Sequence, residues 1–374
     1  MANTFLTPSI IAREALMRLQ ANLVMGGLVH RNYSQEYQKV GDTVTIRKPI
    51  NFTAKDFVQG TGIEVQNATE TSTSVTLDKW KDVSFELTTL ERALKLEEIS
   101  QKLIDPAMRA IAQVMDEDLL KLYVDVPHFN GTCGTTPSGI SAFTGSLEGL
   151  DTRKVPMGDR QIVFGPVANA KLLELDSINS AEKSGTTEAL RNASMGRIMG
   201  MDTYMDQNVQ SHSIGTVSPG AGTGWAVSGS TATGSTTALI DTTTGSGTIK
   251  KGTLFTVAGD TTKYVLTADA TVASNQLSIA FHPAVVTAWA DNAVVTIYAN
   301  HVANLAFHPN AFALVTRPLE PPMGGARGEV IAYNGIAVRV VYDYNITYKK
   351  DIVSLDVLYG VKTLEDDMAQ RIVG

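Results

Sequence analysis

Residues 105–124 show the clearest hydrophobic periodicity in the chain. Apolar side chains recur there every three or four residues, which places them on one side of an α-helix: Met108, Ile111, Met115, Leu119 and Leu122. Asp105 can cap this helix, Pro106 suits its first position, and no later Gly or Pro interrupts it. We therefore expect a single straight helix about 30 Å long.

The acidic residues of this helix lie away from the apolar side. They are Asp116, Glu117 and Asp118, and Glu117 precedes Lys121 by one turn, the spacing of a helical ion pair. We expect these side chains to form a solvated face.

The N-terminal part of the chain predicts a helix followed by strands. Ala12, Leu16, Leu19 and Leu23 share one helical face, and Gly26-Gly27 is expected to end that helix. Alternation then predicts strands around Val44 and Ile46 and around Val83, Phe85 and Leu87, with one further alternating piece at Val75 and Leu77. The connection is far longer than a usual hairpin loop, so we expect a long two-stranded flap.

Between the flap and residue 215, helices and strands alternate. Thr88 and Glu91 fit a capping box that opens a helix reaching Leu103, and residues 127–158, rich in Gly, Thr and Pro, are expected to be irregular. Short strands are predicted at 161–164 and 201–205, and helices at 167–175 and 188–193. This order favours a mixed α/β layer.

Composition changes sharply at Thr216. Residues 216–300 are rich in Thr and poor in charge, and short β runs recur between turn residues, which indicates a small antiparallel barrel or sandwich. Mixed character returns at 304–315, so this module is expected to be an insertion. The tail is predicted to be mostly sheet, ending in a helix or strand at 364–373.

Charge and composition limit the possible partners. A length of 374 residues is enough for two or three domains with buried cores. Of these residues, 43% are hydrophobic and only 18% are charged. The net charge of −7 argues against a whole-chain affinity for nucleic acid or anionic membrane. A single cysteine, Cys133, excludes an intramolecular disulfide, and neither a secretory signal nor a membrane span is predicted.

The search for reactive groups points away from an enzyme. The six histidines (His30, His128, His212, His282, His301 and His308) are scattered in sequence, and none is paired at helical metal-ligand spacing. Phosphate-binding, dinucleotide-binding and nucleophile-elbow glycine motifs are absent. Neighbouring carboxylates at 116–118 or Asp366-Asp367 rarely converge on one point, and Cys133 is a weak candidate nucleophile. We expect no catalytic residue, no cofactor and no metal.

The first fifty residues are basic on an acidic protein. Their cations are Arg13, Arg18, Arg31, Lys39, Arg47 and Lys48, against three acids. Aromatic residues are not interleaved with them as a nucleic-acid stacking platform requires, so a protein partner is favoured over DNA.

Three strings resemble a known family: MGRIMGMDTYMDQNV at 195–209, FHPNAFALVTRPLEPP at 307–322, and DVLYGVKTLEDDMAQRIVG at 356–374. With the order of elements, they make the chain similar to the major capsid (coat) proteins of tailed phages, in particular the P-twenty-two type. The resemblance implies an α+β fold of the Hong Kong 97 type with an inserted small all-β barrel domain.

The resemblance also implies a division into segments. They are an N-terminal arm (1–41), an extended β-hairpin loop (42–88), a peripheral domain with its spine helix (89–159), an axial domain in two parts (160–215 and 302–340), the inserted domain (216–301), and a C-terminal sheet returning to the peripheral domain (341–374).

The function that the resemblance implies is structural. Copies would assemble as hexamers and pentamers into an icosahedral shell around double-stranded DNA, in the host cytoplasm, with a scaffolding protein, a portal and decoration proteins as partners and no membrane. Opposite charges would meet between subunits: Arg47, Lys48 and Lys55 against Glu97, Glu98, Asp116, Glu117 and Asp118. The alternative is a polysaccharide-binding or polysaccharide-acting protein with a β accessory module, which would show clustered aromatic residues in 216–301.

Overall fold

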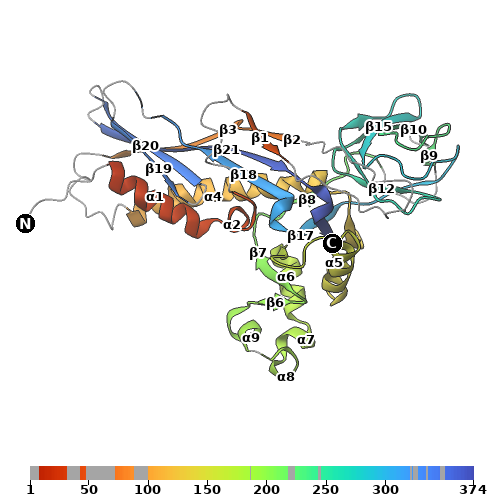
Figure 1. Cartoon of the computed structure of the whole chain (residues 1–374), viewed down its shortest axis with the longest axis horizontal. Coiled ribbons are helices and arrows are strands. Elements are labelled where there is room, and N and C mark those ends of the chain that lie inside the picture. Colours follow the sequence, from red (N-terminus) through yellow and green to blue (C-terminus); the bar gives the residue numbers. More distant parts are fainter. Residues whose placement is uncertain are drawn as a thin grey trace, which may run out of the picture. The chain divides into compact units, whose positions relative to one another are not determined.

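The computed structural model describes residues 8–31, 43–47, 72–87, 100–185, 187–217, 224–242, 246–320, 322, 327–333, 336–345 and 350–374. The chain mixes helices and strands and divides into two compact units (Figure 1). The first unit comprises residues 1–21, 31–111 and 314–362, and the second comprises 22–30, 112–313 and 363–374.

Two helices open the chain, α1 (Pro8–Asn22) and α2 (Met25–Leu28). The predicted face of α1 is buried at Ala12, Leu16 and Leu19. The predicted helix end at Gly26-Gly27 is wrong, because α1 stops at Asn22 and both glycines lie within α2. The backbone N–H groups of Val24 and Gly26 are bound by a distant carboxylate, which fixes the break between the two helices.

The long predicted helix is confirmed as α4 (Asp105–Leu120). It continues from a π-helical turn (Ser100–Ile104) and ends earlier than predicted, in a 3-10 turn (Lys121–Asp125). Met108, Met115 and Leu119 have no exposed surface, as their spacing predicts. The helix predicted to begin at Thr88 lies outside the described residues except for its last turn.

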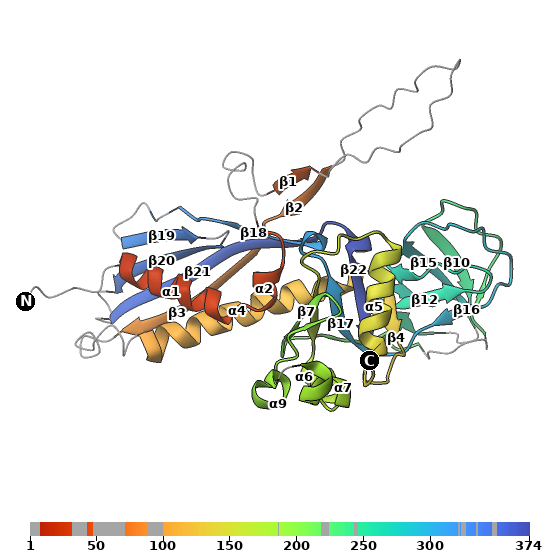
Figure 2. The same ribbon diagram turned by 60° about the horizontal axis from the view of Figure 1, so that its bottom comes forward.

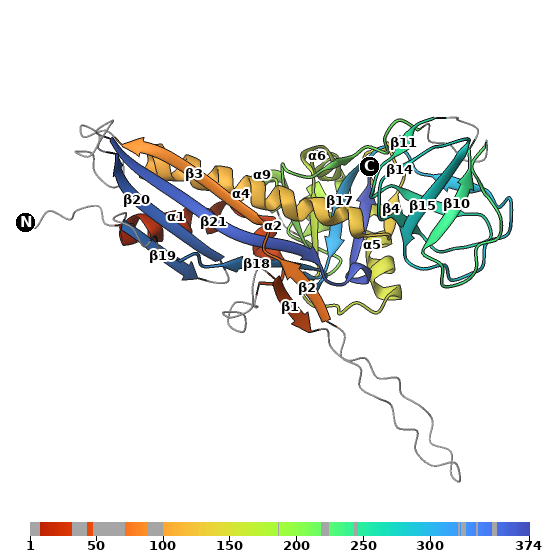
Figure 3. The same cartoon turned by 90° about the horizontal axis from the view of Figure 1, so that it is seen from above.

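The first unit is built on a sheet in the order β18-β21-β20-β19, and β3 pairs with the edge of β21 opposite β20. The pairs β19–β20, β20–β21 and β21–β3 are antiparallel. Its strands are β3 (Lys79–Leu87), β18 (Phe312–Arg317), β19 (Arg327–Tyr333), β20 (Ile336–Asn345) and β21 (Lys350–Thr363). The alternating Val353, Leu355, Val357 and Tyr359 are fully buried, which confirms the predicted strand. α1 and the first part of α4 lie on one side of this sheet (Figures 1 and 3).

The predicted flap begins as a hairpin. β1 (Thr43–Arg47) pairs antiparallel with β2 (Ser72–Thr76), with Val44 opposite Val75. Figure 2 shows this hairpin beside the larger sheet of the first unit. In the described ranges the two strands form a sheet of their own, so the flap uses the piece around Val75, and the strand 79–87 belongs to the larger sheet instead.

The second unit contains a mixed sheet in the order β4-β22-β17-β5-β7-β6, with β8 added to β17. Its strands are β4 (Phe129–Gly131), β5 (Gln161–Phe164), β6 (Arg197–Ile198), β7 (Met201–Met205), β8 (Ser211–His212), β17 (His301–Phe307) and β22 (Ala369–Val373). The strand alternative for the C-terminus is therefore confirmed. Segment 341–374 divides between the units, since β21 belongs to the first and β22 to the second.

Helices accompany this sheet. They are α5 (Ser141–Thr152), α6 (Pro166–Leu173), α7 (Asp176–Asn179), α8 (Ala181–Ser184) and α9 (Glu188–Asn192). The prediction that 127–158 is irregular is wrong, because this segment forms β4 and α5. Phe143 and Leu150 of α5 pack with Ile162 and Phe164 of β5 in one buried cluster.

The predicted insertion is all β. Its sheet runs β16-β12-β13-β15-β10-β9, formed by β9 (Ala226–Val227), β10 (Thr237–Asp241), β12 (Leu254–Val257), β13 (Tyr264–Leu266), β15 (Gln276–His282) and β16 (Val295–Ile297). A second pair joins β11 (Thr248–Ile249) to β14 (Ala270–Thr271). The N–H of Val295 donates to the carbonyl of Trp225 at 2.9 Å, and the N–H of Val227 donates to Ala293 at 2.9 Å, so hydrogen bonds link the two ends of the strand order.

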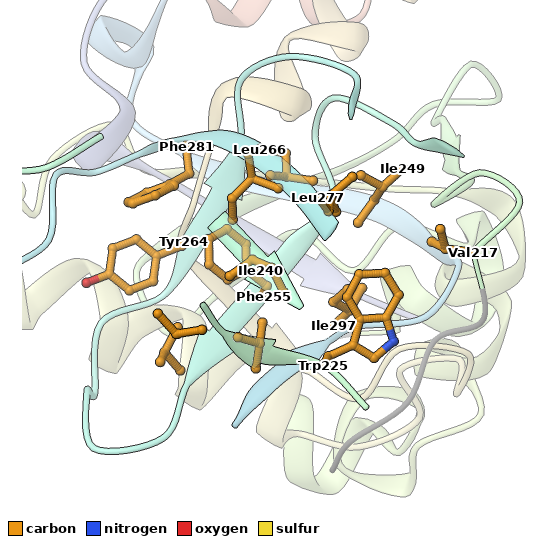
Figure 4. Close-up of a cluster of buried hydrophobic side chains, with 14 of the residues drawn as sticks. Val217, Trp225, Ile240, Ile249, Phe255, Tyr264, Leu266, Leu277, Phe281 and Ile297 are labelled. Carbon is orange, nitrogen blue, oxygen red and sulfur yellow. The ribbon is translucent and has the colours of Figure 1, made fainter. Parts of the chain in front are cut away.

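The interior of this β module is apolar and aromatic. Figure 4 shows Phe255, Tyr264 and Phe281 converging from β12, β13 and β15. Trp289 stacks on Phe281 with ring centroids 5.0 Å apart. The buried cluster draws its members from residues 214–297 alone, so the module has its own core.

Candidate functional site

A buried polar cluster lies where the β module joins the sheet of the second unit. It consists of Tyr123, His212, Thr253, His301 and Arg371. β8 enters the module and β17 leaves it, and the two strands pair with His212 opposite His301. The ring centroids of these histidines are 5.2 Å apart, so two histidines that are scattered in sequence come together in the fold.

The hydrogen bonds of this cluster define the histidine tautomers. The Thr253 hydroxyl donates to the carbonyl of Lys250 at 2.7 Å, so it accepts from Nε2–H of His212 at 3.1 Å. Nδ1 of His212 is then unprotonated and accepts from the Tyr123 hydroxyl at 2.9 Å. Nδ1 of His301 faces the carbonyl of Ala299 at 3.0 Å and therefore carries a hydrogen. Both rings are neutral in this arrangement.

Burial and a neighbouring cation keep the two histidines neutral. Burial, with a further contribution from Arg371, lowers the pKa of His212 to about 3. Burial also lowers the pKa of His301 to about 4. Groups with these pKa values do not exchange protons near pH 7, so the cluster is suited to holding the module on the sheet rather than to acid–base catalysis.

Arg371 is the charged member of the cluster and has no exposed surface. Its guanidinium donates to the carbonyl of Gly252 at 2.8 Å and lies 5.1 Å from the ring centre of Tyr123. Burial lowers its pKa to about 9, so it stays protonated at neutral pH. Because β22 carries Arg371 and the module carries Gly252, this bond fastens the module to the sheet.

A second polar group surrounds the 3-10 turn Asp366–Met368. Nε2 of His282, at the end of β15, lies 2.8 Å from Oδ2 of Asp366. Nε2 of His128 lies 2.9 Å from Oδ1 of Asp367. Arg153, which directly follows α5, donates to the backbone carbonyl of Asp367 at 2.7 Å. The neighbouring carboxylates Asp366 and Asp367 therefore each bind a different histidine.

Asp116 is the most altered carboxylate of the predicted acidic face. Its oxygens accept from the backbone N–H groups of Val24 and Gly26, both at 2.8 Å. Burial, with a smaller contribution from the nearby Asp206, raises its pKa to about 7, and the backbone hydrogen bonds oppose this rise. The prediction of a solvated acidic face is wrong for Asp116 and Asp118, which are 2% and 9% exposed.

The remaining predicted contact residues divide into three groups. The predicted Glu117–Lys121 ion pair is confirmed, with 2.8 Å between Oε1 and Nζ. Arg47 is the last residue of β1, and the structure describes its backbone only. Lys48, Lys55, Glu97 and Glu98 lie outside the described residues. The proposed contacts between them remain a prediction.

Reactive chemistry finds little support in the described part of the chain. Burial raises the pKa of the Cys133 thiol to about 11, which disfavours the nucleophilic thiolate. Among the described residues, no group of three His, Cys, Asp or Glu side chains could hold a metal ion. A pocket of about 240 Å³ beside β4 is lined by Thr, Ser, Gly and aliphatic residues with Asn130, and none of the lining side chains titrates.

Exposed apolar side chains mark two surfaces. Trp80 on β3 is 59% exposed, yet its Nε1–H donates to Asp356 at 3.0 Å, and Asp356 also binds Arg339. In the second unit, exposed apolar side chains lie on α6, on α9 and on the β6–β7 hairpin: Val167, Leu190, Met199, Tyr204 and Met205. None of the helices in the described ranges has the length and apolar character that a membrane span requires.

Solved structures resemble this chain in fold. A chain from Mycobacterium phage Che8 is 16% identical with a TM-score of 0.52, over 94% of this chain and 90% of that one. A chain from the capsid structure of Cyanophage P-SCSP1u is 11% identical with a TM-score of 0.48, over 89% and 84%. One from the mature capsid of bacteriophage PhiM1 is 10% identical with a TM-score of 0.47, over 94% and 86%. No protein-family model and no curated protein sequence matches the chain.

Proposed function

We propose that this chain is the major capsid protein of a tailed bacteriophage, with a Hong Kong 97 type fold. The carrying observation is the likeness to the chain from Mycobacterium phage Che8, which extends over 94% of this chain and 90% of that one. A likeness over nearly the full length of both chains concerns the whole arrangement of elements rather than one common motif. It supports the family resemblance of the three sequence strings.

The proposed segments follow from this assignment. Residues 1–41 are the arm, 42–88 the extended loop, 89–159 the peripheral domain, 160–215 with 302–340 the axial domain, and 341–374 the C-terminal sheet. The inserted domain, 216–301, is a small barrel of the P-twenty-two type, which the hydrogen bonds joining β9 to the segment before β16 support.

Self-association into hexamers and pentamers is the proposed mode of assembly. The five exposed apolar residues on α6, α9 and the β6–β7 hairpin support it, because exposed apolar side chains favour protein contacts. The resulting icosahedral shell encloses double-stranded DNA. It assembles in the host cytoplasm with a scaffolding protein and a portal, and decoration proteins bind its surface. The role is structural rather than enzymatic.

Charge contacts between subunits are a second part of the proposal. Arg47, Lys48 and Lys55 of one copy face Glu97, Glu98 and Glu117 of the next. Asp116 and Asp118 contribute less, because Asp116 already binds backbone N–H groups and both are buried. Each exposed pair contributes about 0 to 1 kcal/mol, so the contact acts through its repetition around the shell.

The polysaccharide alternative loses its main support. Sugar binding by the module would use accessible aromatic rings, but Trp225 and Trp289 are only 5% and 2% exposed. Tyr264, Phe255 and Phe281 are also buried in the module core. The aromatic residues therefore stabilise the module.

Electron microscopy and sedimentation of the purified full-length protein test the proposal. We expect closed, roughly spherical particles, alone or after co-expression with an assembly partner. A stable monomer or dimer under every condition, including co-expression, would contradict a shell function. Substitution of Arg47 and Lys48 by Glu should lower the particle yield and weaken the dependence of that yield on salt. An unchanged yield with unchanged salt dependence would contradict the proposed charge contact.

A further inference from the structure

The turn Asp366–Met368 connects two parts of the second unit that are distant in sequence. On one side, Asp366 binds His282, which ends β15 of the β module, at 2.8 Å. On the other side, Asp367 binds His128, which directly precedes β4 of the sheet, at 2.9 Å. One short turn therefore holds the end of the module close to the sheet through two histidine–carboxylate pairs.

The surroundings of His282 are acidic. Three carboxylates act on its ring: Asp366, Asp367 and Asp125. Asp125 is itself paired with Lys251 at 2.8 Å. The hydrogen bond to Asp366 is the largest cause that raises the pKa of His282 above its ordinary value, and burial opposes it. The imidazolium form is therefore favoured when the module lies against the turn.

Three basic groups act on Asp367. These groups are His128, Arg153 and His282, and the hydrogen bond with His128 is the largest cause that lowers the pKa of Asp367. The carboxylate is 70% exposed, so solvent weakens these interactions. Arg153 also donates to the carbonyl of Ala369 at 3.2 Å, which fixes the backbone after the turn. The turn thus keeps its position while His282 changes charge.

We propose that the turn Asp366–Met368 is an acid-strengthened latch that fastens the end of β15 to the sheet of the second unit. Because binding to the carboxylate favours protonated His282, the latch is fully closed below the ordinary histidine pKa of about 6.5. Its contribution is lost as the pH rises through the higher pKa of the latched ring. The module remains attached at higher pH, since the bond from Arg371 to Gly252 does not depend on His282.

Hydrogen exchange of the unassembled full-length chain at pH 6 and pH 8, corrected for intrinsic rates, tests the latch. We expect peptides covering 276–290 and 361–369 to open about two- to five-fold more often at pH 8 than at pH 6, the range of a partly exposed ion pair. Peptides covering β16, which lies on the same module but pairs with β12 rather than with β15, serve as the internal control and should change equally in wild type and variants. His282→Gln should open at pH 6 as the wild type does at pH 8.

A second variant keeps the test decisive. In Asp366→Asn, the histidine ring remains and its pKa, measured by NMR titration, should fall towards 6.5. Equal opening of the wild type at both pH values, or unchanged pH dependence in His282→Gln, would overturn the latch. These measurements use unassembled protein, so they are independent of whether the chain forms shells.

Discussion

The buried pair His212 and His301 should make the chain sensitive to mild acid. Their folded-state pKa values of about 3 and about 4 lie below the ordinary value of 6.5. Above pH 6.5 both rings are therefore mainly neutral in the folded and in the unfolded chain. As the pH falls, the unfolded chain takes up protons that the folded chain cannot. At pH 5 this linkage costs about 2 kcal/mol for each ring, or about 4 kcal/mol together, a large part of a typical folding free energy.

The perturbation that isolates this effect is His212→Gln, which places an amide where the ring bonded Tyr123 and Thr253 but cannot titrate. Urea unfolding of the unassembled chain, followed by circular dichroism at pH 7 and pH 5, gives the stability change with pH. We expect the change to be smaller by about 2 kcal/mol in His212→Gln than in the wild type. His282→Gln is the matched control, because the raised pKa of His282 works in the opposite direction. An equal pH dependence in wild type and His212→Gln would refute the assignment of a neutral, buried ring.

Three further outcomes are expected. Asp116→Ala should destabilise the chain by about 2–3 kcal/mol, since two backbone N–H groups lose their side-chain acceptor, whereas Glu117→Ala should cost less than about 0.5 kcal/mol in the same urea titration. Gly252→Ala should be much more destabilising in thermal unfolding than Gly229→Ala, because both glycines have positive φ but only the added Cβ at Gly252 would meet Val124, at 2.8 Å; equal effects would contradict this close approach. Excised 216–301 should fold alone and give a β circular dichroism spectrum, and a random-coil spectrum would show dependence on the parent unit.

Periodicity predicted the elements that bury one regular face. The apolar spacing of α4 and the alternation in β21 follow directly from burial of one side, and both were predictable. α5 was missed because Gly145 and Gly149 lower helix propensity. They are needed for packing: a Cβ at Gly149 would lie 1.9 Å from Oε1 of Gln370 on β22. This requirement exists only after the strand has packed against the helix.

The polar clusters depend on contacts that no local pattern encodes. His212 and His301 meet because β8 and β17 pair in a particular register, although the whole β module separates them in sequence. Asp116 was assigned to solvent because helical spacing gives the side of a helix but not what covers it. Its partners are the backbone N–H groups of Val24 and Gly26, which carry no side-chain signal.

The pairing of β8 with β17 also has a consequence for how this protein can vary. The two strands form the stem of a hairpin in which an entire domain takes the place of the turn. Because the ends of the inserted segment already lie side by side, its length and content can change without moving the strands that carry it. Such a position accepts exchange of one module for another, or its reduction to a tight turn, while the remaining sheet keeps its register.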